Sequence, residues 1–177
     1  FFEWALLLPA AVPAYIIAYT YTDFFEYAGP VQGMLRDVFG WKNAQDYWFP
    51  NIRSMGGAIF VMASVLYPYI YLMARTSFIS TPISFYQTSS IHGKNIFLNV
   101  AIPLARPGIV AGLALVLMET ISDFGTVDYF ALETLTLGVF NVWLGMNSLS
   151  GAAQISCVLF IFVIVLLSLE LIARKRQ

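Results

Sequence analysis

Long stretches without a charged residue dominate the pattern of hydrophobic and polar positions along the chain. The stretches Trp4 to Thr22, Ser54 to Ala74 and Ala152 to Leu169 contain 19, 21 and 18 residues, and none includes Asp, Glu, Lys or Arg. A helix needs about 20 mostly apolar residues to cross the hydrocarbon layer of a membrane. Each stretch therefore predicts a membrane-spanning helix.

A fourth segment, from about 103 to 122, is similarly long but carries Arg106 near its start and Glu119 near its end. None of the four segments shows the period-two alternation that is typical of transmembrane β-strands. We therefore expect an all-α fold, a polytopic transmembrane helix bundle that forms a single domain over residues 1–177. The predicted spans lie at about 4–22, 54–74, 103–122 and 152–172.

The composition agrees with a membrane location. Apolar residues make up 59% of the chain, charged residues make up 11%, and the mean hydropathy is +0.75. Soluble domains are on average about 45–50% apolar and about 25% charged. These values exclude an ordinary soluble domain and a disordered chain, and the net charge of -1 argues against nucleic-acid binding.

The positions of the few charges predict the orientation of the spans. The loop at about 76–102, with its flanking residues Arg75 and Arg106, carries only basic charges, and three more basic residues lie at 174–176. Lys and Arg are in excess in the cytoplasmic loops of membrane proteins. The connections 23–53 and 119–150 contain eight of the ten acidic residues. We therefore expect this loop and both termini in the cytoplasm, and the two acidic connections outside.

The residues of metal and redox chemistry are scarce. Cys157 is the one cysteine and His92 the one histidine, so an internal disulfide and a zinc-type cluster are excluded. We expect no metal site and no cofactor bound by this chain. Because the sequence starts with FFEW, without a methionine or a basic flank, we also expect it to be part of a longer protein.

Prolines and small residues lie within the predicted spans. Pro9, Pro13 and Pro68 remove backbone hydrogen bonds, which indicates either a bent, moving helix of a transporter or a static kink. Gly108 and Gly112 are four residues apart, and small residues at this spacing let two transmembrane helices approach closely. We interpret the glycine pair as a helix-packing feature.

Two pairs of polar side chains are candidates for a transport pathway. Glu119 and Asp123 are four residues apart, which predicts one shared helix face near the outer end of the third span. They either line the mouth of a pathway or solvate and cap the helix end. Tyr67 and Tyr71 also share a face; phenol oxygens suit hard metal ions, but an aromatic belt or helix packing is the favoured interpretation.

The two outer connections contain apolar residues of their own. Residues 23–53 include several aromatic residues and the pair Gly29 and Pro30, which predicts a short helix lying on the membrane surface. Residues 134–146 are apolar but too short to cross a membrane. We expect this second segment to be re-entrant or interfacial.

The cytoplasmic loop contains a candidate docking element. Pro82 precedes the segment ISFYQTSSIHG at 83–93, which is compatible with a short helix, and the chain re-enters the membrane at IPLARPGI. A short inner helix between two spans is a natural docking element for a cytoplasmic partner.

This loop resembles the one found in bacterial ABC-importer permeases, which reads Glu-Ala-Ala, three residues, Gly, nine residues and Ile-x-Leu-Pro. Gln87, Thr88 and Ser89 lie at the Glu-Ala-Ala positions, Gly93 at the glycine and Pro103 at the closing proline. The stretches YTDFFEYAGPVQ within 20–32, LYPYIYLMAR at 66–75 and METISDFGTVDYF at 118–130 are similar to the permease subunit of ferric-iron importers, a MetI-like ABC permease core.

The loop departs from the family pattern in two ways. Gln87 replaces the glutamate, and Gly93 precedes Pro103 by ten positions where the family has thirteen. A second register, counted back from Pro103, places Ser84 at the glutamate and Ser90 at the glycine. Neither register contains the acidic residue.

The resemblance implies a bacterial inner-membrane permease that imports ferric iron, delivered by a periplasmic binding protein, by alternating access. It implies that ATP is hydrolysed on a separate cytoplasmic ATPase subunit, so that this chain is not itself an enzyme. It also implies a second permease half or homologous subunit, and it makes this chain the C-terminal part of one half.

Several other functions stay open from the sequence. One alternative is an ABC importer permease with a different cargo, namely another metal, thiamine, a polyamine or sulfate. A second is a hydrolase that uses Glu119 and Asp123 as a carboxylate pair. A third is a non-transporting scaffold or an inactive remnant.

Overall fold

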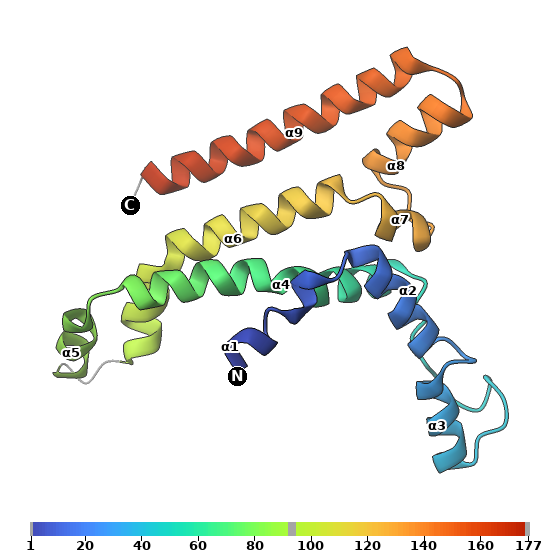
Figure 1. Cartoon of the computed structure of the whole chain (residues 1–177), viewed down its shortest axis with the longest axis horizontal. Coiled ribbons are helices and arrows are strands. Elements are labelled where there is room, and N and C mark those ends of the chain that lie inside the picture. Colours follow the sequence, from blue (N-terminus) through green and yellow to red (C-terminus); the bar gives the residue numbers. More distant parts are fainter. Residues whose placement is uncertain (1, 92–94, 176–177) are drawn as a thin grey trace. The chain divides into compact units, whose positions relative to one another are not determined.

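The computed structural model describes residues 2–91 and 95–175. The described chain is 78% helical and contains no strand, which confirms the all-α prediction. In chain order (Figure 1), the elements are α1 (Phe2–Ala5), η1 (Leu8–Ala11), α2 (Ala14–Phe25), α3 (Pro30–Phe39), α4 (Met55–Ser80), α5 (Ile83–Ile91), η2 (Phe97–Ala101), α6 (Ile102–Ser122), α7 (Gly125–Tyr129), α8 (Leu135–Phe140), η3 (Asn141–Gly145) and α9 (Leu149–Lys175).

Three helical segments in the described part are long and apolar enough to cross a membrane. They are Met55–Ser80, Phe97–Ser122 and Leu149–Ser168, with 26, 26 and 20 residues. At about 1.5 Å per residue, each is as long as the roughly 30 Å hydrocarbon layer. They match the second, third and fourth predicted spans, and a membrane-embedded protein is therefore indicated.

The prediction of a continuous first span at 4–22 is wrong. The segment is divided into α1, the 3₁₀-helix η1 and α2. Val12, between η1 and α2, is extended, with φ -115° and ψ 127°. Pro13 explains this conformation because a proline disfavours the helical region for the residue before it, and its ring blocks continuation of the preceding turn.

The third span begins at Phe97 instead of about 103. The five residues Phe97–Ala101 form the π-helix η2, which continues directly into α6. The wider turn is closed by the N–H of Ile102, which donates to the carbonyl of Phe97. Pro103, which has no N–H to donate, follows immediately, so the π-turn lies where an ordinary helical hydrogen bond is lost.

The contacts divide the chain into two compact units. Unit 1 comprises Phe1–Val65 and Asp123–Ser156, and unit 2 comprises Leu66–Ser122 and Cys157–Gln177. The core of unit 1 forms where α2, the start of α4 and α7 supply small and aromatic residues. Its buried members are Ala18, Ile52, Ala58, Val61 and Phe130.

Both connections that the sequence predicts to lie outside contain short helices, and α3 confirms the short helix predicted within 23–53. Pro30 opens α3, where its missing N–H costs nothing. Gly40 ends α3 in the left-handed conformation, with φ 71°. In the second connection, α8 and η3 form one apolar helix, Leu135–Gly145, whose start is capped by Thr134.

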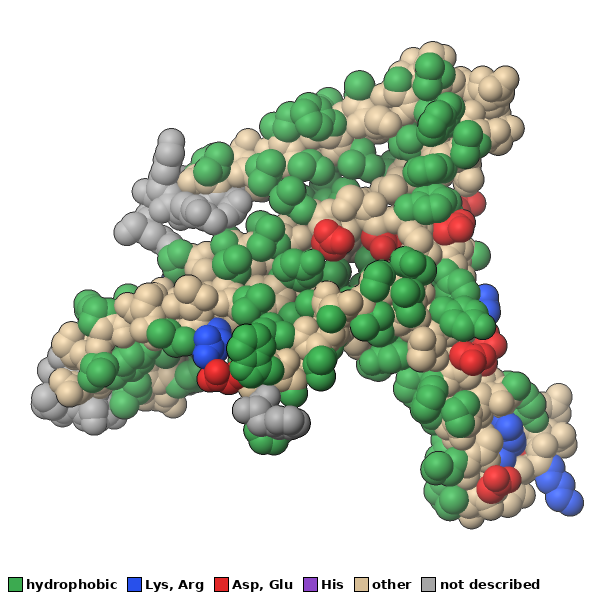
Figure 2. Space-filling model, viewed as in Figure 1, with side chains coloured by type: hydrophobic (Ala, Val, Ile, Leu, Met, Phe, Trp, Pro, Cys, Tyr) green, Lys and Arg blue, Asp and Glu red, His purple; other side chains and the backbone are tan. Residues whose placement is uncertain are grey.

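In unit 2, α5 follows α4 after a short bend and packs against η2. Many large hydrophobic residues of the spans are exposed, among them Leu72, Leu104, Leu113 and Phe162. Figure 2 shows hydrophobic side chains along the helices, while charged side chains are sparse. Helices with this distribution are suited to contact with lipid or with other membrane helices.

Candidate functional site

The predicted docking segment is a helix. α5 covers Gln87, whose side chain is exposed, and the backbone of Thr88 and Ser89. The hydroxyl of Tyr86 donates to the carbonyl of Phe78 over 3.4 Å, which ties α5 to the end of α4. Gly93, placed at the family's glycine, lies outside the described residues. The side chains of Thr88 and Ser89 also lie outside the described part.

Gly108 and Gly112 lie where α6 approaches α4 within unit 2 (Figure 1). A Cβ atom on Gly108 would lie 2.6 Å from the carbonyl oxygen of Met73, and one on Gly112 would lie 2.8 Å from Cα of Ile70. Both distances are too short for real atoms. The two glycines therefore allow the backbones of α4 and α6 to come into direct contact.

The predicted shared face of Glu119 and Asp123 does not exist. α6 ends at Ser122, so Glu119 is on the helix and Asp123 is beyond its end. The carboxylate of Asp123 instead accepts hydrogen bonds from the N–H groups of Thr126, over 2.9 Å, and Val127, over 3.3 Å. Asp123 thus caps α7, the following helix, whereas the second interpretation from the sequence has it cap or solvate the end of the third span.

Tyr67 and Tyr71 lie in the half of α4 that belongs to unit 2, and both side chains are partly buried. Pro68, between them, is fully buried, and α4 continues through it. The α-helix therefore absorbs this proline without a break. A role of either tyrosine in a pathway stays a prediction.

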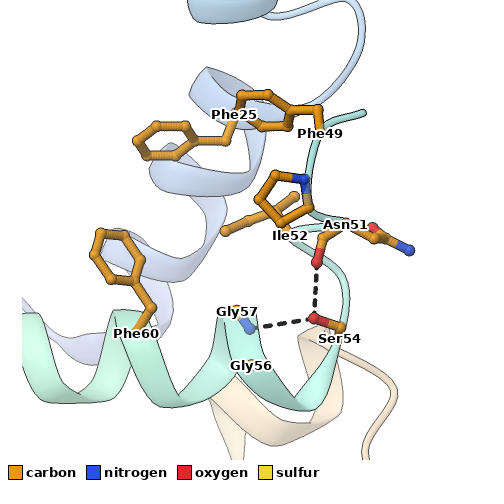
Figure 3. Close-up of a pocket in the computed structure, with 9 residues that line it drawn as sticks. Phe25, Phe49, Asn51, Ile52, Ser54, Gly56, Gly57 and Phe60 are labelled. Carbon is orange, nitrogen blue, oxygen red and sulfur yellow. Dashed lines mark hydrogen bonds between the residues drawn. The ribbon is translucent and has the colours of Figure 1, made fainter. Parts of the chain in front are cut away.

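An apolar pocket of about 340 Å³ opens in unit 1 between the end of α2 and the start of α4 (Figure 3). Its walls are largely aromatic and aliphatic. At its edge, the hydroxyl of Ser54 donates to the carbonyl of Asn51 over 2.7 Å and accepts from the N–H of Gly57 over 3.2 Å. These hydrogen bonds lie at the N-terminal end of α4. The pocket is lined by Phe25, Phe49, Pro50, Asn51, Ile52, Ser54, Gly56, Gly57 and Phe60.

A polar network holds α3 against the chain that precedes α4. The buried side chain of Gln32 donates to the carbonyl of Phe25 over 2.7 Å and accepts from the hydroxyl of Tyr47 over 2.6 Å. The guanidinium of Arg36 donates to that hydroxyl over 3.0 Å and to the carbonyl of Tyr27 over 2.8 Å. It also lies 4.2 Å from the centre of the Tyr27 ring. The connection 23–53 is therefore held together by specific side-chain contacts.

Arg53 connects three separate segments of unit 1. Its Nε donates to the carboxylate of Glu26 over 2.6 Å, and its Nη2 donates to the hydroxyl of Tyr129 over 3.3 Å. The guanidinium also lies 4.9 Å from the centre of the Tyr129 ring. Its hydrogen bond with Glu26 is the largest factor that raises the pKa of Arg53, so the group stays fully charged.

The sequence does not predict the contacts of Arg53 with Glu26 and Tyr129. It predicts only a surface helix with aromatic residues within 23–53, and it assigns Glu26 and Arg53 to a connection outside the membrane. The available signal is that Arg53 directly precedes the charge-free stretch that begins at Ser54, while Glu26 lies four residues after the stretch that ends at Thr22, so that two such segments packed together bring the charges close.

No protein-family model matches the chain, and no curated protein is significantly similar to it.

Proposed function

We propose that this chain is a transmembrane subunit of an ATP-driven ABC importer, and that α5 is its docking helix for a cytoplasmic ATPase. The observation that carries the proposal is the position of α5. A helix of nine residues connects two membrane-length helices, α4 and η2–α6. The proposal further draws on the family resemblance of the loop and of three other stretches.

The surface of α5 suits a protein partner. Ile83 is 72% exposed and Phe85 is 51% exposed. Gln87 is also exposed and lies four residues after Ile83, so these two side chains share a helix face. Exposed apolar side chains next to polar ones are typical of a protein interface. A membrane-facing role for α5 is less suitable because the segment also contains Ser84, Gln87 and Thr88.

The packing of α4 against α6 provides the mechanical link. The two helices are in backbone contact at Gly108 and Gly112, and α5 lies in the connection between them. Displacement of α5 by an ATPase therefore moves both helices together instead of bending a loose loop. ATP-driven closure of the ATPase would use this coupling to favour one of two states with different access to the membrane's sides.

The proposed cargo follows from the family resemblance, and the proposed orientation in the membrane follows from the positions of the charges. We propose ferric iron, delivered by a periplasmic binding protein, as the cargo, with another small solute as the alternative. The proposed location is a bacterial inner membrane, with α5 and both termini in the cytoplasm by the positive-inside rule. Three long helices do not enclose a pathway, so a second permease half or homologous subunit completes the transporter.

Copurification from native membranes tests the docking role. A tagged full-length chain, expressed in the organism that encodes it, should copurify with vanadate-sensitive ATP hydrolysis. Phe85→Asp should reduce the copurified activity at least about tenfold, as expected for loss of a central apolar contact. Trp48→Asp is the matched control, since Trp48 is an exposed aromatic residue of the connection 23–53.

Equal ATPase recovery with the wild-type chain, Phe85→Asp and Trp48→Asp would contradict docking through α5. Solute-stimulated hydrolysis, measured with ferric-binding and other binding proteins in turn, then decides the cargo.

A further inference from the structure

A second pocket in unit 1 lies between α2 and α7. It has a volume of about 410 Å³, within the range of small-molecule sites. Tyr15 and Tyr19 are four residues apart on α2 and therefore share a face, while Tyr129 closes the pocket from α7. The remaining lining residues are Ile16, Gly125 and Asp128.

The aromatic walls are held in place by specific contacts. The rings of Tyr19 and Tyr129 meet edge to face, with their centres 5.9 Å apart. A Cβ atom on Gly125 would lie 3.0 Å from Cβ of Tyr15, so glycine lets α7 approach α2 closely at this point. The guanidinium of Arg53 also bonds to the hydroxyl of Tyr129. The pocket is thus built from packed elements.

The one charge in the lining is the carboxylate of Asp128. This carboxylate is exposed, and it has no hydrogen-bond or ion-pair partner within residues 2–91 and 95–175. Asp123, five residues earlier, shows the contrast because its carboxylate is used to cap α7. The charge of Asp128 is therefore free to interact with a ligand.

We propose that this pocket binds a small organic ammonium ion. The faces of tyrosine rings are electronegative, and the exposed rings of Tyr15 and Tyr19 attract a cation that is too large and weakly hydrated to require direct ligands, while Tyr129, whose ring already lies under Arg53, completes the wall. Asp128 supplies the compensating negative charge at the wall. Aromatic walls with one carboxylate match the chemistry of a quaternary or alkylated ammonium group.

A metal ion is a poorer match for the same pocket. No group of three or more His, Cys, Asp or Glu residues that could hold a metal occurs within the described part of the chain. Asp128 would be the only carboxylate ligand, and the hydroxyl of Tyr129 already interacts with a guanidinium cation.

The inference goes beyond the proposed import function and does not depend on it. All six lining residues belong to unit 1, whereas the proposed docking helix belongs to unit 2. Binding at this pocket is measured on the purified chain without an ATPase, so the two proposals fail separately.

Isothermal titration calorimetry of the full-length chain in detergent, with choline as the probe, tests whether this pocket binds an organic ammonium ion. Choline should bind, and its neutral isostere 3,3-dimethylbutan-1-ol should bind at least about fivefold more weakly, as expected for loss of cation–π attraction. Asp128→Asn should weaken choline binding about threefold, as for an exposed charge pair. Asp37→Asn, a change of another exposed outer carboxylate, should leave the affinity unchanged.

A matched pair of variants separates the ring from the hydroxyl. Tyr19→Phe should retain choline binding, whereas Tyr19→Leu should weaken it about fivefold. Tyr15→Phe and Tyr15→Leu repeat the comparison should a Tyr19 variant fail to fold by circular dichroism. Equal binding of choline and its isostere, equal losses in the Phe and Leu variants, or displacement of choline by ferric citrate would overturn the proposal.

Discussion

Arg53 and Glu26 form an ion pair of 2.6 Å that joins Glu26, just after α2, to Arg53, two residues before α4. Their side chains are 49% and 41% exposed. Because exposed ion pairs contribute little to stability, the pair matters mainly for geometry. It places the guanidinium over Tyr129, and thereby connects α2, α4 and α7 at one point.

Replacing Arg53 by Lys should therefore have more effect on the order of α7 than Glu26→Gln. Lys keeps the charge but lacks the planar group that both stacks on Tyr129 and bonds to Glu26. We expect faster amide hydrogen exchange in α7 for Arg53→Lys and a small change for Glu26→Gln that disappears at high salt. Equal exchange rates in both variants would show that the stacking has no structural role.

Gly112→Ala should destabilise the contact between α4 and α6. The added Cβ would lie 2.8 Å from Cα of Ile70, and a backbone atom cannot move aside as a flexible side chain can. We expect a loss of about 1–3 kcal/mol, as for an overpacked core site, measured as thermal unfolding in detergent.

Gly138→Ala provides the control for this prediction because nothing lies within 4 Å of a Cβ atom at Gly138. In this helical position, alanine should be neutral or should stabilise by up to about 1 kcal/mol. A Gly112→Ala chain as stable as Gly138→Ala would refute close packing of the two helices.

Asp123→Ala should loosen the start of α7. The change removes the acceptor for the N–H groups of Thr126 and Val127, and lost helix caps cost about 0.5–2 kcal/mol. Asp123→Asn keeps an acceptor oxygen and should be milder. Hydrogen exchange at these two amides separates the outcomes; the cap has no role if exchange is the same in Ala, Asn and wild-type chains.

The turn at 42–46, between α3 and α4, should lose stability at acidic pH. The N–H of Asn43 and then that of Lys42 donate to the carboxylate of Asp46 and lower its pKa. A lowered pKa in the folded chain means that the stabilisation is present above the unfolded value of about 3.9 and is lost as the pH falls through the folded value. Amide exchange at these donors should therefore increase only below about pH 4.

Asp46→Asn is the matched variant for this titration. It should show the same exchange rates across the acid range after correction for intrinsic exchange. An acid response that is unchanged in Asp46→Asn would assign the effect to another group.

The sequence predicts α4 and α9 well because a charge-free run of about 20 residues has few other stable states in a membrane, and it predicts α6 from an apolar run of similar length that carries Arg106 and Glu119. It predicts α5 for a similarly local reason, since Pro82 and the polar residues that follow separate it from the spans. The first span fails because hydropathy counts Pro9 and Pro13 as neutral, whereas their rings prevent a continuous helix.

The pockets of unit 1 could not be predicted in the same way. Tyr129 is more than a hundred residues from Tyr15 and Tyr19 along the chain, and only the packing of α2 on α7 brings the three together. The shared face predicted for Glu119 and Asp123 fails for a local reason. Asp123 bonds to the backbone of the next helix, which ends α6 one residue before it.

Site-specific photocrosslinking at α5 tests the central claim most directly. Benzoylphenylalanine at Phe85, introduced into the tagged full-length chain in the organism that encodes it, should crosslink to an ABC ATPase identified by mass spectrometry, with a yield that changes when ATP is trapped with vanadate. The same label at Trp48 should give no ATPase adduct. The account is contradicted if the Phe85 label captures no ATPase, or if the Trp48 label captures the same one equally well.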